Sequence, residues 1–422
     1  MRPVLLICSL LGVFIAAWLS HPPHVLAPFA QASPNNSKVA AAPQYTSRFV
    51  SSQLTDFVHS SSVTALPGGD LMAVWFAGSR EGAADVQVRT ARFDARSGEW
   101  GAEQVLATRE STRDGTQRYI RKLGNPVIAL GPDKRLWMFY VSVSVGGWAT
   151  SAINVMVSED LGANWSAPRQ LVTSPFFNIS TLVRAAPVFH ADGSIGLPVY
   201  HEFMGKFAEY LYLSADGAVI DKFRISRGKN SLQPTIVAQD GLRAVAMLRY
   251  AGDTYHRVLA SRTIDAGQTW SEPYPLEPAN PNSSLAAVAT RDDGLLVALN
   301  DLQDGRFKLS LYGTDAQFSQ WRTVIELDQS PDPLGQPFAH EAYKEIIGEG
   351  FRSSSGAQRL PLEQRFLSNL DYRVCKPSGC DFEYEYPYFS RSPDGMYHLV
   401  YSWNNTFIKH VSFNEAWLAE HL

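Results

Sequence analysis

The feature that most limits the possible folds is a turn followed by an apolar strand, repeated along most of the chain. The turns contain Gly or Pro next to Asp, and such turns between apolar runs are typical of hairpins. The first five turns lie about 50–60 residues apart, and the last spacing is about twice as long. The strands that follow the six turns are LMAVWFAG, RLWMFYVSV, SIGLPVY, LRAVAMLRY, LLVALND and MYHLVYSW.

This repeat predicts an all-β fold, because helical periodicity is almost absent between the turns. Small antiparallel sheets repeated at this length are typical of a β-propeller. We therefore expect a six-bladed β-propeller of four-stranded blades over residues 45–418, with an insertion at about 331–380 in the last blade. The structural alternatives are a large β-sandwich or a parallel β-helix, but a sandwich does not explain a repeated unit of this length.

Composition limits the classes of partner. The chain has 422 residues, of which 45% are hydrophobic and 18% charged, enough for one large domain or two ordinary ones. The formal net charge is −4 and the basic residues are scattered, so we expect no nucleic-acid partner. No feature of the sequence indicates the oligomeric state.

The N-terminus differs from the rest of the chain. An apolar run at Val4–Leu19 follows Arg2, so residues 1–20 are interpreted as a signal peptide or a signal anchor, followed by a flexible Pro/Ala/Ser-rich linker at 21–44. Ala30 and Ala32 suit a signal peptidase but lie far downstream of the run, which is slightly shorter than the ~17 residues of a membrane span. Both readings stay open, and both predict export: periplasmic, anchored in the inner membrane facing the periplasm, or secreted.

Two cysteines lie close together in CKPSGC. Cys375 and Cys380 are separated by a Pro-Ser-Gly turn, which in an exported protein predicts a small disulfide-closed loop. The alternative is half of a metal site, but a second pair of Cys or His at ligand spacing is missing. We therefore expect neither a metal nor a cofactor.

A second repeated signature is Ser/Thr-x-Asp-x-Gly-x-x-Trp. It occurs at Ser158–Trp165 and Thr263–Trp270, with degenerate copies at Phe93–Trp100 and Thr314–Trp321. The Gly permits a tight turn, the Asp caps backbone amides and the Trp fills space between hairpins. These segments resemble the Asp-box, or BNR repeat, of sialidase-type propellers, where the box is structural.

With its HSSS and QPT segments, the chain resembles the bacterial sialidase-like branch of the sialidase (neuraminidase) superfamily over the whole propeller. The resemblance implies an exo-acting glycoside hydrolase that releases sialic acid or a related keto-sugar acid with retention, through a Tyr nucleophile. A carboxylate would activate the Tyr, an Asp would act as acid/base, and three arginines would hold the substrate carboxylate. A neutral phenol avoids the repulsion that a negatively charged nucleophile would meet at a carbon bearing a carboxylate.

The resemblance points to FEYEYPYFS for the nucleophile. Tyr386 matches its place best, and Tyr388 is the near alternative. Strict strand alternation would put both tyrosines on one face and Glu383 and Glu385 on the other, so we expect the activating carboxylate to come from another blade. The alternative reading is that these tyrosines only pack the strand.

Arginines matching the family occur in three blades. Arg249 and Arg306 match the second and third carboxylate-binding arginines, and guanidinium groups pair carboxylates bidentately. In GSREGAADV, the resemblance makes Arg80 a substrate contact and Asp85 the acid/base. The alternatives are surface arginines and an Asp that caps a turn. Arg121, Asn125 and Arg184 are further pocket candidates, and NPNSS (residues 280–284) either binds sugar hydroxyls or forms a turn.

Two positions depart from the family pattern. His59 stands where the first arginine is expected, and Gln233, a neutral amide, stands where the activating Glu is expected. Glu202 is the first candidate for a replacement base; Glu341 and Glu345 in the insertion are the second. The departures favour the alternative of a non-catalytic carbohydrate-binding or scaffold propeller in the cell envelope, and a hydrolase or lyase for another acidic sugar is a third possibility.

Overall fold

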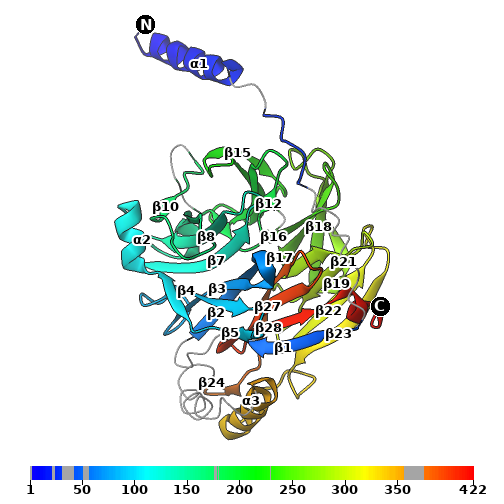
Figure 1. Cartoon of the computed structure of the whole chain (residues 1–422). Coiled ribbons are helices and arrows are strands. Elements are labelled where there is room, and N and C mark those ends of the chain that lie inside the picture. Colours follow the sequence, from blue (N-terminus) through cyan, green and yellow to red (C-terminus); the bar gives the residue numbers. More distant parts are fainter. Residues whose placement is uncertain are drawn as a thin grey trace.

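The computed structural model describes residues 2–20, 24–30, 42–50, 57–174, 178, 180–228, 230–355 and 375–422. Six small antiparallel sheets form a propeller, with the first strands of neighbouring blades in contact (Figure 1). The predicted six-bladed β-propeller is therefore confirmed. The fold is mostly β rather than all-β, because it also contains helices, and two of the six sheets have five strands instead of the expected four.

The blades follow one another in chain order. Blade 1 contains β2 (Phe57–Ala65), β3 (Leu71–Gly78), β4 (Gln87–Asp94), β5 (Glu99–Trp100) and β6 (Gln104–Ala107). Blade 2 contains β7 (Lys122–Leu130), β8 (Leu136–Val143), β9 (Ser151–Ser158) and β10 (Arg169–Gln170). Blade 3 contains β11 (Leu182–Val183), β12 (Val188–Phe189), β13 (Ile195–His201), β14 (Phe207–Leu213) and β15 (Val219–Arg224).

The second half of the ring repeats the pattern. Blade 4 contains β16 (Ser231–Ala238), β17 (Ala244–Tyr250), β18 (Arg257–Thr263) and β19 (Tyr274–Ala279). Blade 5 contains β20 (Ala286–Ala289), β21 (Leu295–Leu299), β22 (Lys308–Thr314) and β23 (Trp321–Gln329). Blade 6 contains β26 (Tyr384–Arg391), β27 (Tyr397–Trp403), β28 (Phe407–Phe413) and β1 (Tyr45–Phe49).

Blade 6 is built from both ends of the chain. Its outer strand β1 pairs antiparallel with β28, from Tyr45 opposite Phe413 to Phe49 opposite Lys409. Beside this pair, the Gln44 amide donates to Asn414 Oδ1 at 3.0 Å. The ring is therefore closed by hydrogen bonds between segments at opposite ends of the sequence.

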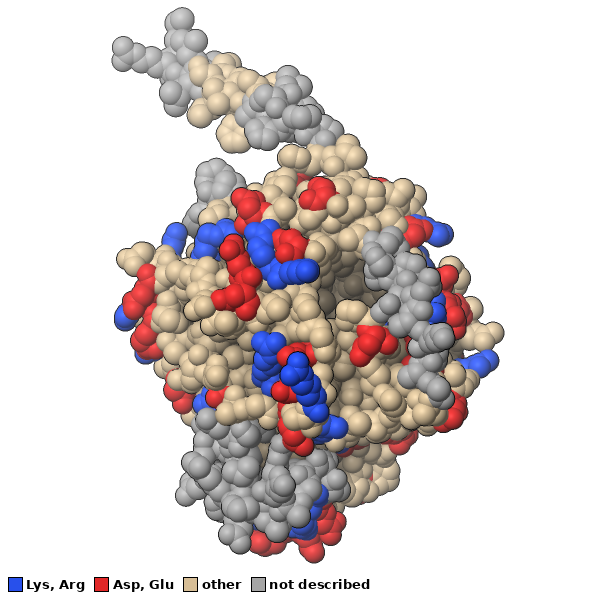
Figure 2. Space-filling view, viewed as in Figure 1, with Lys and Arg blue, Asp and Glu red and all other residues tan. Residues whose placement is uncertain are grey.

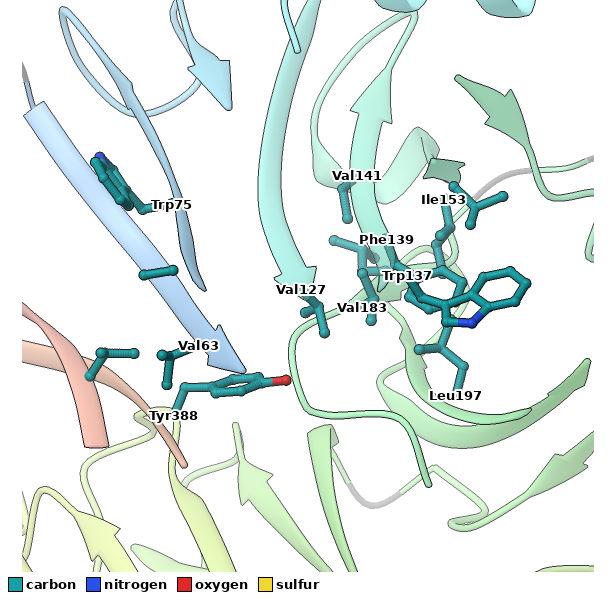
Figure 3. Packing of buried hydrophobic residues seen from close by; sticks show 14 of the residues in the cluster. Val63, Trp75, Val127, Trp137, Phe139, Val141, Ile153, Val183, Leu197 and Tyr388 are labelled. Carbon is teal, nitrogen blue, oxygen red and sulfur yellow. The ribbon is translucent and has the colours of Figure 1, made fainter. Parts of the chain in front are cut away.

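The core lies between the blades. The middle strands β3 and β8 are buried along their whole length, since neighbouring sheets cover both of their faces, and they therefore read as continuous apolar runs. Figure 3 shows Tyr388 between Val63 and the strand of Val127, and its hydroxyl donates to the Ile128 carbonyl at 3.2 Å. The Tyr388 side chain thus packs in the core and joins blade 6 to blade 2 by a hydrogen bond.

The two intact Asp-boxes lie between the third and fourth strands of blades 2 and 4. In the second box, Thr263 Oγ1 donates to Asp265 Oδ1 at 2.8 Å, and Asp265 Oδ1 accepts from the Thr269 amide at 2.9 Å. Trp270 Nε1 donates to the Gly267 carbonyl at 2.9 Å. The copy at Ser158–Trp165 has the same bonds, which agrees with the structural role expected for the box.

Four helices and two short 3-10 turns complete the described elements. The helices are α1 (Arg2–Ser20), α2 (Arg109–Thr116), α3 (His340–Ser355) and α5 (Glu415–Ala419); the 3-10 turns are η1 (Pro67–Gly69) and η2 (Trp148–Thr150). The insertion before blade 6 contains α3 and a hairpin of β24 (Cys375–Lys376) and β25 (Gly379–Cys380), with Cys375 and Cys380 joined in a disulfide. Residues 356–374 of the predicted insertion lie outside the described residues.

The N-terminal helix α1 projects away from the propeller (Figure 1). In the described part of the chain, no helix combines the length and apolar character needed to cross a membrane. Residues 24–30 differ from the expected flexible linker, because Leu26 and Phe29 are buried against blades 3 and 4. The other linker residues 21–23 and 31–41, including Ala32, lie outside the described residues.

Candidate functional site

The site is built on a distortion shared by all six blades. Near the start of each inner strand, one residue other than glycine has a left-handed backbone with φ between 45° and 58°. In four of these strands the residue lies within a β-bulge, which breaks the side-chain alternation and redirects side chains. The six residues are Ser60, Asn125, Ser180, Gln233, Asn282 and Tyr386.

One of these residues, Tyr386, lies against a guanidinium group. Arg249 Nη1, from β17, donates to Tyr386 Oη at 3.4 Å and to Gln233 Oε1 at 3.2 Å. Gln233 Nε2 and Asn125 Nδ2 in turn donate to the buried Tyr200 hydroxyl at 3.5 Å and 3.2 Å. Side chains from blades 2, 3, 4 and 6 therefore form one continuous polar network.

The network continues through blade 5. Arg249 Nε donates to Asn282 Oδ1 at 2.7 Å, and Arg306 Nη2 donates to the Asn282 carbonyl at 3.1 Å. Arg306 Nη1 also forms a salt bridge with Glu385 in blade 6. Asn282 thus lies between two arginines and holds both.

Blade 1 closes the circle with His59. Its Nδ1 lies 3.7 Å from Glu385 Oε2, and its ring meets the Tyr386 ring edge-on with 4.4 Å between centroids. Burial lowers the pKa of His59, although Glu385 and Glu81 oppose this effect. We therefore treat His59 as neutral near pH 7, unlike the arginine it replaces.

The two glutamates that precede Tyr386 in the chain, Glu383 and Glu385, differ in their ionisation. Burial and the charge of Glu385 raise the pKa of Glu383 to about 7. Burial also opposes ionisation of Glu385, but the pKa of Glu385 lies below the usual range: the charge of His59 lowers it when His59 is protonated, and Arg306 lowers it through its charge and a hydrogen bond. Near neutral pH, Glu385 is therefore the ionised partner of Arg306, while Glu383 is part protonated.

Arg184 lies beneath Tyr386, where the inner strand of blade 3 is interrupted between β11 and β12. Its guanidinium carbon lies 5.0 Å from the Tyr386 ring centroid, and Nη2 donates to the carbonyls of Tyr386 and Pro387. Arg184 is only 2% exposed, and its Nε and Nη1 have no hydrogen-bond partner among the described residues. Burial lowers its pKa to about 10, so it stays a cation and supports the strand that carries Tyr386.

The predicted alternation of tyrosines and glutamates fails at this point. Tyr384 and Tyr388 are buried as packing residues, whereas Tyr386 is half-buried and Glu385 turns into the same network. The cause is the bulge between Glu385 and Tyr388, with φ 54° at Tyr386. The expectation that Glu385 points away from the site is therefore corrected.

A sequence signal for these bulges was present. The left-handed residue is followed directly by Pro in three inner strands, at Asn125, Gln233 and Tyr386. Pro inside a strand marks an edge or a bulge because it cannot donate to the ladder. Read this way, the X-Pro repeat would have located three site residues from sequence.

Other predicted residues lie elsewhere. Asp85 is exposed and accepts from the amide and hydroxyl of Ser79 at 3.0 Å and 2.9 Å, so it caps its own turn. Arg80 is exposed in the same loop. Arg121 is exposed and donates to the Gly146 carbonyl at 3.3 Å. Among the described residues, none of these side chains forms a hydrogen bond or a cation–π contact with Tyr386.

Two other acidic residues, Glu202 and Glu81, interact through their charge with residues of the site. Burial raises the pKa of Glu202, with Arg249 acting against this rise and Glu81 adding to it. Glu81 follows Arg80 in blade 1 and was not singled out from the sequence, although it lies in the segment that was. In contrast, Glu341 and Glu345 are exposed on α3 in the insertion.

Comparison with known proteins agrees with this architecture. The model of the BNR repeat-like domain matches residues 69–399. The chain belongs to the BNR repeat-like family. None of the curated protein sequences matches it.

Solved structures similar to this BNR repeat-like chain include sialidases. The Hadza microbial sialidase Hz136 aligns with a TM-score of 0.61 and 13% identity, over 84% of this chain and 65% of that one. A Trypanosoma rangeli sialidase in complex with the inhibitor DANA aligns with a TM-score of 0.60 and 13% identity, over 89% of this chain and 59% of that one. The chain thus spans less than two thirds of either sialidase.

A third solved structure has no assigned activity. The protein of unknown function from Dyadobacter fermentans DSM 18053 aligns with a TM-score of 0.64 and 11% identity, over 89% of this chain and all of that one. At such identities the similarity shows the shared fold and leaves the reaction open. The chemistry of the chain depends on the side chains at its own site, because one fold can host many reactions.

Proposed function

We propose that the chain is an exported glycoside hydrolase that removes a sialic acid or a related keto-sugar acid from the end of a glycan or envelope polysaccharide. The observation that carries this proposal is the convergence of Arg249, Arg306 and Tyr386 from three blades. Arg249 lies within hydrogen-bond distance of the phenol, and Asn282 joins the two arginines. A sugar carboxylate placed on the guanidinium groups would bring its anomeric carbon near Tyr386 Oη.

Charge supports an anionic ligand. Arg184, Arg249 and Arg306 contribute three positive charges around Tyr386. Glu385 pairs with Arg306, and Glu202 interacts with Arg249 when it is ionised, but the buried Arg184 has no acidic partner among the described residues. Removing an unpaired charge from water is costly, so a ligand carboxylate would offset part of this excess. On the end of the propeller seen in Figure 2, Lys, Arg, Asp and Glu are interspersed around a hollow.

The proposed reaction has two balanced steps. Glu202 takes the phenol proton, Tyr386 Oη bonds to the anomeric carbon, the bond from that carbon to the glycan oxygen breaks, and this oxygen takes a proton from Glu81. A water molecule then gives a proton to Glu81, its oxygen bonds to the anomeric carbon, the bond to Tyr386 breaks, and Glu202 returns the phenol proton. Two displacements retain the configuration.

The assignment of acid and base follows from the environment of each carboxyl. Both oxygens of Asp85 accept from Ser79, whereas Glu81, on the exposed loop after β3, acts through its charge to raise the pKa of His59 and of Glu202. Burial raises the pKa of Glu202, which makes its carboxylate a better proton acceptor. Glu81 therefore replaces Asp85 in the proposed acid/base role.

The test is release of free 2-keto sugar acid from sialyl, pseudaminyl and Kdo linkages. We expect Tyr386→Phe to lower turnover by at least ~100-fold, since it removes the nucleophilic oxygen. Tyr388→Phe is the matched control, because that tyrosine packs between blades. If the wild-type protein releases nothing from all three substrate classes, the hydrolase proposal fails. If Tyr386→Phe keeps full activity, the assignment of Tyr386 as the nucleophile fails.

The second candidate is a non-catalytic propeller that binds acidic carbohydrate. It is favoured by Gln233, and by the finding that no carboxylate among the described residues is hydrogen bonded to Tyr386 Oη. Glycan binding that survives Tyr386→Phe, without turnover by the wild type, would support this candidate. An unsaturated sugar among the products would instead indicate a lyase.

A further inference from the structure

We infer that Asn282 is the positioning residue that fixes Arg249 and Arg306 relative to each other, so that the pair can hold a sugar carboxylate. This inference rests on the proposed function for its ligand. The two arginines come from different blades, and in the described residues Asn282 is their shared partner. Its side chain accepts from Arg249 Nε at 2.7 Å, and its backbone carbonyl accepts from Arg306 Nη2 at 3.1 Å.

The backbone conformation makes this double contact possible. Asn282 has φ 55°, a left-handed conformation that Asn adopts more readily than most residues. Two different atoms of one residue, Oδ1 and the carbonyl oxygen, thereby face guanidinium groups of different blades. A larger or β-branched residue at this position would strain the turn and lose the side-chain acceptor.

Buried amides immobilise the turn around Asn282. Asn280 Oδ1 accepts from the Ser283 amide at 3.0 Å, and Ser283 Oγ donates to Asn300 Oδ1 at 2.7 Å. Asn300 Nδ2 donates to the Tyr384 carbonyl at 2.9 Å, on the strand that carries Tyr386. Asn280, Ser283 and Asn300 are each no more than 1% exposed. The same buried hydrogen bonds therefore fix the position of the two arginines relative to the Tyr386 phenol.

The hydrogen bond from Arg249 Nε to Asn282 also orients the rest of the Arg249 side chain. With Nε on Asn282 and Nη1 facing Gln233 and Tyr386, the plane of the guanidinium group is fixed. Its Nη2 has no hydrogen bond among the described residues and is the group offered to a ligand. Without Asn282, Arg249 would keep its charge but lose this orientation.

The substitution Asn282→Gly tests the contact with Arg249 independently of the contact with Arg306. Glycine tolerates positive φ and keeps the carbonyl that accepts from Arg306, but it removes Oδ1. We expect KM for the sugar-acid glycoside, and Kd for free N-acetylneuraminic acid or Kdo, to rise about 10- to 100-fold, with kcat within a factor of about three. Asn230→Gly is the matched control, because Asn230 is also left-handed at φ 50° but exposed, and we expect no change.

Asn282→Asp tests orientation against charge. The carboxylate keeps an acceptor for Arg249 Nε but compensates its charge, so Arg249 should stay in place while ligand affinity falls. Crystal structures of both variants provide a readout that needs no ligand. Arg249 in its wild-type position in Asn282→Gly would overturn the inference. If Arg249 moves in Asn282→Gly but wild type binds no sugar acid, positioning is upheld and the proposed function fails.

A separate observation concerns the N-terminal segment 24–30. Phe29 is 1% exposed, its amide donates to the Gly241 carbonyl at 2.7 Å, and its ring lies 5.1 Å from that of His190. The Ala191 amide donates to the Pro28 carbonyl at 2.8 Å. We infer that this segment belongs to the mature folded protein and that export processing does not cut at Ala30 or Ala32. A cut there would remove the segment and expose the apolar surface that it covers.

The N-terminus of the protein recovered after export decides this point. The full chain is expressed with its own N-terminus in a bacterial host, and the N-terminal peptide is read by mass spectrometry. Any start at or before residue 24 supports the inference, whereas a start at 31 or 33 overturns it. Phe29→Ala should lower the melting temperature, while Val25→Ala, at a side chain that is 84% exposed, should not. Equal melting temperatures for both variants would also contradict it.

Discussion

The part-buried carboxyl of Glu383 should make the stability of the propeller depend on pH. Glu383 lies just before β26, and its Oε2 accepts from Asn405 Nδ2 at 2.7 Å. Burial and the nearby charge of Glu385 raise its pKa from 4.5 to about 7. Replacing it with Gln keeps an acceptor for Asn405 but removes the ionisation, so Glu383→Gln isolates the effect of this charge.

The sign follows from proton binding. Between pH 4.5 and about 7 the folded protein keeps a proton on Glu383 that the unfolded chain has lost. The stabilisation is thus fully present below pH 4.5 and is lost as pH rises through about 7. At about 1.4 kcal/mol per pH unit, this window corresponds to roughly 3 kcal/mol of unfolding free energy. Glu383→Gln should lack this loss and become more stable than wild type by about that amount near pH 7.5.

Urea unfolding at pH 4.5, 5.5, 6.5 and 7.5 measures the effect. The free-energy difference between Glu383→Gln and wild type should grow steadily across the series. Glu341→Gln is the control, because that side chain is 88% exposed on α3. Parallel pH profiles for wild type and Glu383→Gln would refute the argument that burial and Glu385 hold a proton on this residue.

Three further predictions concern packing and turns. Tyr388→Phe removes the 3.2 Å bond to the Ile128 carbonyl and should cost about 1 kcal/mol in urea unfolding; a loss of turnover instead would contradict its packing role. Gly196→Ala would place Cβ 1.6 Å from the Tyr210 hydroxyl oxygen, so little soluble folded protein should form, and a normal yield and melting temperature would refute the clash. Asp265→Ala removes acceptors from two threonine side chains and should lower the melting temperature by about 2–4 °C; an unchanged value would show that the box is dispensable.

The fold was accessible from sequence because its signals are local. In each blade a turn joins the first and second strands, and the second strand is buried on both faces, so it reads as an apolar run such as LMAVWFAG. The strand that closes the ring, β1, has no such signal, because its partner β28 lies at the opposite end of the chain. The packing of Phe29 also has no local signal in the sequence, because it depends on a surface formed by blades 3 and 4.

The site was predicted only in part. The resemblance pointed to Arg249, Arg306 and Tyr386, and the structure brings these three residues together. Alternation misplaced Glu385, because a bulge with positive φ at a residue other than glycine leaves the hydrophobic pattern unchanged. Contacts such as Asn282 to two arginines depend on the spacing of blades, which no local pattern encodes.

The pairing of β1 with β28 also has a consequence for biosynthesis. A chain emerging from the ribosome can complete blades 1 to 5 in order, but blade 6 has to wait for its final strands. The N-terminal strand must therefore remain unpaired until translation is almost finished. Because β1 and β28 pair within one sheet, a circular permutant that links β28 to β1 and is opened in an exposed loop between two other blades would turn this late, long-range pairing into an early, local one.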